Sequence, residues 1–124
     1  MSQNKIIITA GVIKIEGQLN ESITARRIWE ILPIKSEVKT WGDEIYFEIP
    51  LRMELENPVE SVNIGDLGYW PPGNAFCIFF GKTPASTESE IKPASAVSPI
   101  GICEEDPIVL RKISDGEKIT IEKL

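Results

Sequence analysis

Aromatic and acidic side chains gather in the stretch TWGDEIYF (residues 40–47), where they could form a ligand site. Glu44 and Tyr46 share one face of a predicted strand, and Trp41 precedes it. Tyr and Trp combine a large apolar surface with a polar group, which suits ligand recognition. A carboxylate accepts a hydrogen bond from a cationic or amide group. The structural alternative is that these aromatic side chains only pack in a core or a hairpin.

Two further clusters extend this candidate site. In GDLGYWPPGNAFCIFFGKTP (residues 65–84) two aromatic residues lie between turn-forming residues, and KPASAVSPIG (residues 92–101) has small side chains that allow close backbone approach. We predict a groove between the outer face of the sheet and the loop 81–96, a surface loop that is either mobile or a lid. The predicted ligand-binding residues are Trp41, Glu44, Tyr46, Tyr69 and Trp70, with Phe79 as a packing floor.

No catalytic or metal-binding motif accompanies these residues. Glu44 and Glu48 are four strand residues apart, about 13 Å, beyond the ~5–9.5 Å that separates the paired carboxyls of glycosidases. The chain contains 0 His, which excludes Ser-His-Asp and Cys-His catalysis and His-ligated zinc or haem. Asp66 is interpreted as the cap of its own turn, and the Gly residues match no phosphate or dinucleotide loop. We therefore predict no catalytic residue, no metal and no cofactor.

Composition is that of one ordered domain, residues 1–124. The chain is 42% hydrophobic and 26% charged, and 19 acidic against 13 basic residues give a net charge of −6, which argues against a nucleic-acid partner. We find no secretory signal and no apolar run long enough to span a membrane, and therefore expect a cytoplasmic protein. Cys77 and Cys103 are predicted to be buried free thiols, with a disulfide as the alternative. Many Ile, Glu and Lys residues hint at a thermophilic source.

The hydrophobic pattern is rich in strands. Strands are predicted at residues 5–9, 12–19, 67–70, 75–80, 97–103 and 118–122, and AFCIFF should be covered on both faces. Strict alternation over residues 43–56 predicts one strand or two collinear strands, with Pro50 marking an edge, a bulge or a break. Helices are predicted at residues 21–32, capped by Asn20 or Ser22, and from Pro107, capped by Asp106. Seven or eight strands with two short helices indicate a closed or nearly closed β-barrel.

The segments WGDEIYF, GDLGYWPPGNAFCIFFGKTP and ASAVSPIG, in this order, resemble the cyclophilin-like family of small prokaryotic proteins, long carried as a domain of unknown function. The resemblance spans nearly the whole chain. It implies a mainly β fold, a closed cyclophilin-like barrel of about eight strands with two short capping helices. The late strand–helix–strand unit VSPIGICEEDPIVLRKISDGEKITI also looks like that of true cyclophilins.

The chain departs from true prolyl isomerases at the residues that catalyse. Their Phe-His-Arg-x-x-Pro strand, matched on Pro50, places Phe47 at the position of the Arg, and the His and Gln of that site are absent. Arg52 lies close by in sequence and falls on the outward-facing side of the alternation, so it stays open as a displaced substitute for the missing isomerase Arg. We therefore predict a non-catalytic module that binds a small molecule or an extended peptide. The alternatives are a prolyl isomerase or other enzyme with a displaced site, and a homo-oligomer joined through its exposed aromatic residues.

Overall fold

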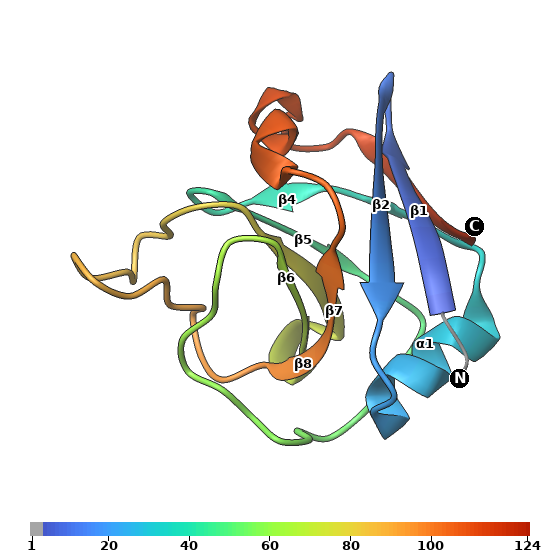
Figure 1. Cartoon of the computed structure of the whole chain (residues 1–124), viewed down its shortest axis with the longest axis horizontal. Helices are drawn as coiled ribbons and strands as arrows, with labels where there is room; N and C mark the ends of the chain where they lie inside the picture. The colour runs from blue at the N-terminus through green and yellow to red at the C-terminus, as the bar shows by residue number, and fades with distance from the viewer. Residues whose placement is uncertain (1–3) are drawn as a thin grey trace.

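The computed structural model describes residues 4–124 and shows a nearly closed barrel of antiparallel strands (Figure 1). The order of hydrogen-bonded neighbours is β3-β9-β1-β2-β8-β6-β7-β5-β4. The strands are β1 (Asn4–Ala10), β2 (Ile13–Leu19), β3 (Ile34–Glu37), β4 (Lys39–Thr40), β5 (Glu44–Glu48), β6 (Asp66–Trp70), β7 (Ala75–Phe79), β8 (Ser98–Cys103) and β9 (Lys118–Lys123). The predicted barrel is confirmed, and it has nine strands in the described residues where about eight were expected.

The segment from β3 to β4 closes the barrel. These two strands are consecutive in the chain, yet they lie at opposite ends of the strand order, where β3 pairs with β9 and β4 with β5. Val38 between them donates its N–H to the carbonyl of Glu117 at 2.8 Å and accepts one from Gly116 at 2.7 Å. Neither strand was predicted, because IKSEVKT is mostly polar and lacks sustained alternation.

Helices cover the two ends of the barrel. Helix α1 (Ile23–Ile31) lies at the lower end of Figure 1 and the 3-10 helix η2 (Pro107–Lys112) at the upper end. Ser22 caps α1 by accepting the Ala25 N–H at 3.1 Å, and Asp106 caps η2 as predicted. The second predicted helix is therefore a 3-10 helix, and a further 3-10 turn, η1 (Pro71–Gly73), joins β6 to β7.

The alternating segment 43–56 is a strand only in its first half. Strand β5 ends at Glu48, and Pro50 breaks the ladder because proline has no N–H to donate. Residues 50–55 then run without strand pairing, with Leu51 and Met53 packed against the core and Leu55 exposed. The expectation of a strand through residue 56 is wrong, although Pro50 was recognised as one place for a break.

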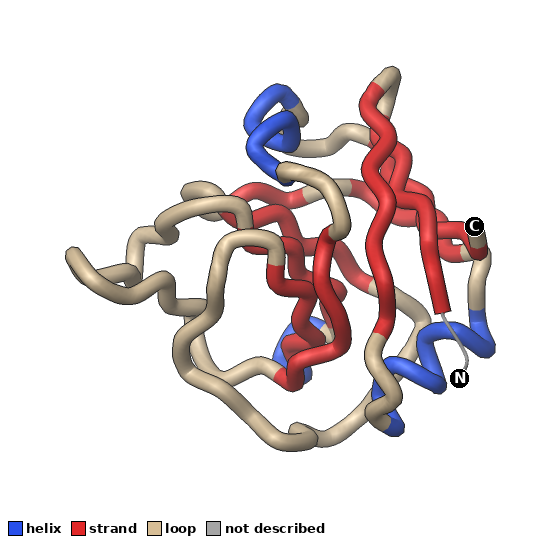
Figure 2. The backbone as a smooth tube through the Cα atoms, viewed as in Figure 1, coloured by secondary structure: helices blue, strands red, loops and turns tan. Residues whose placement is uncertain are grey.

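Two hydrophobic clusters lie on the two faces of β7. The inward side chains Phe76 and Ile78 belong to the main core, whereas Ala75, Cys77 and Phe79 pack outward in a smaller cluster with Val62 and Val97. Segments 57–66 and 81–97 cover this outer cluster, in contrast to the solvated outer face that many antiparallel sheets have (Figure 2). Every residue of β7 is buried, as predicted for AFCIFF. Within residues 4–124, no helix has the length and apolarity needed to cross a membrane.

Candidate functional site

A cavity of about 220 Å³ lies at the rim of the outer cluster, between the sheet and the loop 81–96. Its lining is largely apolar and includes one carboxyl group. Three structural units contribute: the turn and strand 41–46, the end of β6, and the late part of the loop. The lining residues are Trp41, Glu44, Tyr46, Trp70, Pro93 and Ala94. We call this cavity the aromatic pocket.

Strand register determines which side chains reach the aromatic pocket. Glu44 pairs with Phe79 and Tyr46 with Cys77 across β5 and β7, and Trp70 of β6 lies opposite Ala75. Side chains of directly opposed residues point to the same face of a sheet. The outward face therefore presents Glu44, Tyr46 and Trp70 together beside the outward side chains of β7, which are Ala75, Cys77 and Phe79.

The aromatic rings meet at a steep angle. The ring centroids of Tyr46 and Trp70 are 6.2 Å apart, and the ring planes are inclined by 75°. Such an edge-to-face pair is a favourable arrangement of two ring quadrupoles. The indole N–H of Trp70 donates to the hydroxyl of Ser95 at 2.7 Å, which ties the ring to the loop. Together these contacts hold two walls of the pocket in one orientation.

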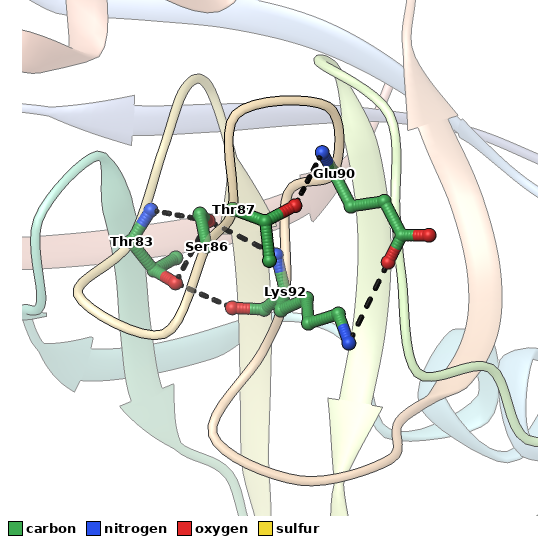
Figure 3. Close-up of polar contacts among 5 residues, drawn as sticks. All are labelled: Thr83, Ser86, Thr87, Glu90 and Lys92. Atoms are coloured by element: carbon green, nitrogen blue, oxygen red, sulfur yellow. Dashed lines mark hydrogen bonds and ion pairs between the residues drawn. The ribbon is translucent and has the colours of Figure 1, made fainter.

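The loop that forms the opposite wall is held by its own hydrogen bonds (Figure 3). The Ser86 hydroxyl accepts the N–H groups of Thr83 at 2.9 Å and Lys92 at 3.0 Å, so it joins the two arms of the loop. The Thr83 hydroxyl donates to the carbonyl of Lys92, and Lys92 forms an ion pair with Glu90 at 3.5 Å. This network positions the chain immediately before Pro93 and Ala94, which line the pocket.

Close backbone contact anchors the start of the loop beside Trp41. Asp43 donates its N–H to the carbonyl of Lys82 at 2.9 Å, and Phe80 donates to the carbonyl of Asp43 at 2.9 Å. A Cβ at Gly81 would lie 2.7 Å from the Cβ of Asp43, so only glycine allows this approach. The Asp43 carboxylate also pairs with Arg111 at 2.6 Å, which connects the turn to η2.

Glu44 is an acid in an apolar environment. It is only 5% exposed, and burial raises its pKa from 4.5 to about 7, an effect partly offset by the neighbouring Cys77 thiol. Burial also raises the pKa of Cys77 well above its ordinary value, and the charge of Glu44 adds to that rise. The thiol therefore stays protonated, and in the structure it donates to the carbonyl of Ala75 at 3.9 Å. Near neutral pH Glu44 exchanges a proton with little cost in free energy.

Four of the six predicted site residues line the pocket: Trp41, Glu44, Tyr46 and Trp70. Phe79 is fully buried in the outer cluster, against which Tyr46 and Trp70 pack, so it lies in the floor beneath the site. Tyr69 does not reach the pocket.

Tyr69 points into the barrel because it is adjacent to Trp70 in a strand, and adjacent strand residues face opposite sides. Its ring is fully buried, and its hydroxyl donates to the carbonyl of Leu51 at 2.7 Å and accepts the N–H of Met53 at 3.2 Å. These bonds fasten the irregular segment after Pro50 to the core.

Sequence reasoning did not single out Pro93, Ala94 or the contact between Cys77 and Glu44. The small residues of KPASAVSPIG were the available signal for the loop wall. Cys77 carried no sequence signal, since its position opposite Tyr46 and its contact with Glu44 depend on how β5 pairs with β7. Both free cysteines agree with the prediction of thiols, although Cys103 is only partly buried.

A larger cavity of about 480 Å³ lies elsewhere, between β2, β8 and the segment 59–66. Two of its polar side chains, Asn20 and Asp66, already have partners in the chain. Asn20 donates to the carbonyl of Pro99 at 3.0 Å and accepts the Ser22 N–H at 3.0 Å, and Asp66 accepts the Asn63 N–H at 2.8 Å. These groups stabilise turns, so the aromatic pocket is the better candidate for a ligand.

Comparisons with known proteins agree with the barrel. A family model described as Cyclophilin-like matches residues 4–122. The hypothetical protein AF2241 from Archaeoglobus fulgidus, known from a solution structure, is 39% identical with a TM-score of 0.83, over 98% of this chain and 95% of that one. McbB, solved in complex with tryptophan, is 14% identical with a TM-score of 0.65, over 95% of this chain and 44% of McbB. No curated protein matches the chain. The chain thus belongs to the cyclophilin-like family.

Proposed function

We propose that the protein is a binding module that holds a small organic molecule, or one side chain of an extended peptide, in the aromatic pocket. The observation that carries this proposal is the set of three aromatic side chains and one carboxyl around a preformed cavity of about 220 Å³. Ligand sites are typically concave and mostly apolar, with a few placed polar groups. The volume is below the ~300–1,000 Å³ of sites for drug-sized ligands, so the pocket suits a fragment or a head group.

Three further observations support a small ligand over prolyl isomerisation. Phe47, which stands at the position of the isomerase Arg, is 1% exposed and stacks on Phe76 inside the barrel. Arg52 is exposed and is not among the residues that line the pocket. McbB, of which 44% aligns with this chain, was solved in complex with tryptophan, a small molecule of the class proposed here.

The experiment is protein-observed NMR with the full chain and a panel of small organic compounds, including tryptophan and short peptides. We expect some members to shift the resonances of Trp41, Tyr46 and Trp70 and to raise thermal stability, by about 2.7 kcal/mol at a hundredfold excess over Kd. Trp41→Ala removes one aromatic wall and should abolish the shifts. The fold should tolerate this change, because among the described residues 4–124 the hydrogen bonding of Trp41 uses its backbone N–H, which donates to the Glu44 carbonyl at 2.9 Å. Trp29→Phe, on α1, is the matched control. Binding unaffected by Trp41→Ala would contradict the proposal.

General acid–base catalysis by Glu44 is the second candidate function. The observation that favours it is a carboxyl beside an accessible cavity with a pKa raised by burial to about 7, since a catalytic pKa is best placed near the working pH. Any compound that binds should then be followed by NMR for conversion over hours. Turnover that Glu44→Gln abolishes while binding persists would make the protein an enzyme; persistent binding without product would exclude this role for that compound.

Two further proposals concern the location of the protein and its assembly state. Two free thiols, Cys77 and Cys103, support a reducing compartment such as the cytoplasm. A homo-oligomer joined through the pocket aromatics would compete with ligand binding. Measuring the mass in solution with and without a bound compound would detect that competition.

A further inference from the structure

Glu44 is a buried acid that lacks a cationic partner. Its side chain is 5% exposed, and the ion pairs of residues 4–124 all involve other carboxylates. Buried carboxylates are ordinarily paired, because an isolated charge in an apolar site is costly. Here the neighbouring Cys77 thiol is protonated and carries no charge. Two species could neutralise the carboxylate: a proton, or a cation that enters through the pocket.

The remaining walls suit a cation better than a neutral group. Trp41, Tyr46 and Trp70 surround the opening, with the rings of Tyr46 and Trp70 inclined by 75° so that they form a corner. Aromatic faces carry negative electrostatic potential and attract cations within about 6 Å of the ring centre. The Glu44 carboxylate, which lines the same cavity, adds a full charge of the same sign when it is ionised. The net charge of −6 also favours the approach of cations.

The largely apolar and aromatic lining favours a cation that carries methyl groups in place of N–H donors. A primary ammonium has three N–H donors that need partners when it is buried. The polar acceptors among the lining side chains are the two oxygens of the Glu44 carboxylate and the Tyr46 hydroxyl, and the indoles of Trp41 and Trp70 are donors only. A methylated ammonium has fewer donors or none, and its methyl groups can contact the aromatic walls and the side chains of Pro93 and Ala94.

We propose that the aromatic pocket binds a methylated ammonium group, tertiary or quaternary, with Glu44 as the counter-charge and Trp41, Tyr46 and Trp70 as the aromatic walls. This inference rests on the proposed binding function and names the ligand class for the same site. The group could belong to a free small molecule or to a methylated lysine of a peptide. Both sources present the same chemistry to the pocket.

The test compares choline with its neutral isostere 3,3-dimethylbutan-1-ol, using NMR titration of the full chain. We expect choline to bind at least about tenfold more tightly, which corresponds to ~1.4 kcal/mol, within the range of one cation–π contact and a partly desolvated charge. Ethanolamine, with a primary ammonium, should bind more weakly than choline. Acetylated trimethyllysine amide tests the peptide source, and its binding relative to choline shows which source fits the opening.

Two Glu→Gln variants on β5 separate charge from shape. Glu44→Gln should weaken choline binding about tenfold and leave the binding of the alcohol nearly unchanged. Glu48→Gln is the control, because Glu48 lies on the same strand, is exposed and does not line the pocket. Equal binding of choline and the alcohol, or choline binding that Glu44→Gln does not weaken, overturns the ammonium inference. If the alcohol or other neutral compounds bind while no cation does, this inference fails and the binding function stands; if no compound binds, both fail.

Discussion

Replacing Glu44 by Gln should stabilise the folded protein at neutral and alkaline pH. Gln resembles a protonated Glu in shape, yet it never carries the negative charge that burial disfavours. In the folded state the pKa of Glu44 is raised from 4.5 to about 7. A shift of about 2.5 pKa units at 1.36 kcal/mol per unit corresponds to about 3 kcal/mol of unfolding free energy.

The pH window follows from which state holds more protons. Between the ordinary pKa of 4.5 and the raised value of about 7, the folded protein keeps the Glu44 proton that the unfolded chain releases. Stability from this group is therefore fully present below the ordinary pKa and is lost as pH rises through about 7. From β7 the Cys77 thiol faces Glu44, and its pKa is raised well above the ordinary value. The pocket residues Pro93 and Ala94 have no ionisable side chains, so no other lining group on the loop complicates this window.

The assay is urea unfolding, followed by tryptophan fluorescence, of the wild type, Glu44→Gln and Glu48→Gln from about pH 4 to about pH 8.5. At acid pH the wild type and Glu44→Gln should have similar stability, and at the alkaline end the variant should be about 3 kcal/mol more stable. With a urea m-value of ~1–3 kcal/mol/M, the midpoints would then differ by at least about 1 M. Glu48→Gln should follow the wild type. Parallel pH profiles for the wild type and Glu44→Gln would refute the burial argument.

Two further substitutions test the supports of the fold. Tyr69→Phe removes the hydroxyl that hydrogen-bonds to the backbone of Leu51 and Met53, and it should lower the free energy of unfolding in urea by about 1–3 kcal/mol. Ligand binding in the aromatic pocket should be unchanged. Loss of binding would show that Tyr69 contributes to the site. Glu56→Gln weakens the cap on the first N–H groups of α1, at a cost of ~0.5–2 kcal/mol. Those hydrogen bonds lower the pKa of Glu56. The contribution of Glu56 to stability is therefore present above the ordinary pKa and is lost as pH falls through the lowered pKa. If Glu56→Gln still destabilised the protein in acid, this assignment would be contradicted.

The local pattern was sufficient to predict most of the barrel. Alternation separated the inward Ile45 and Phe47 from the outward Glu44 and Tyr46, and the structure confirms that division. The apolar run of β7 was expected to be covered on both faces, and it is. The polar segment that forms β3 and β4 was missed, because its pairing comes from closing the barrel and not from its own alternation.

The composition of the site was determined by the sequence, and its geometry by the tertiary structure. Strand parity already allowed only one of the adjacent Tyr69 and Trp70 to face outward, and the pairing of β6 with β7 decided that Trp70 does. The same pairings place Glu44 against Cys77, and the loop 81–96 folds back to cover them. A local pattern shows which side chains share a face but not what covers that face. The burial that raises the pKa of Glu44 therefore depends on contacts between segments far apart in the chain.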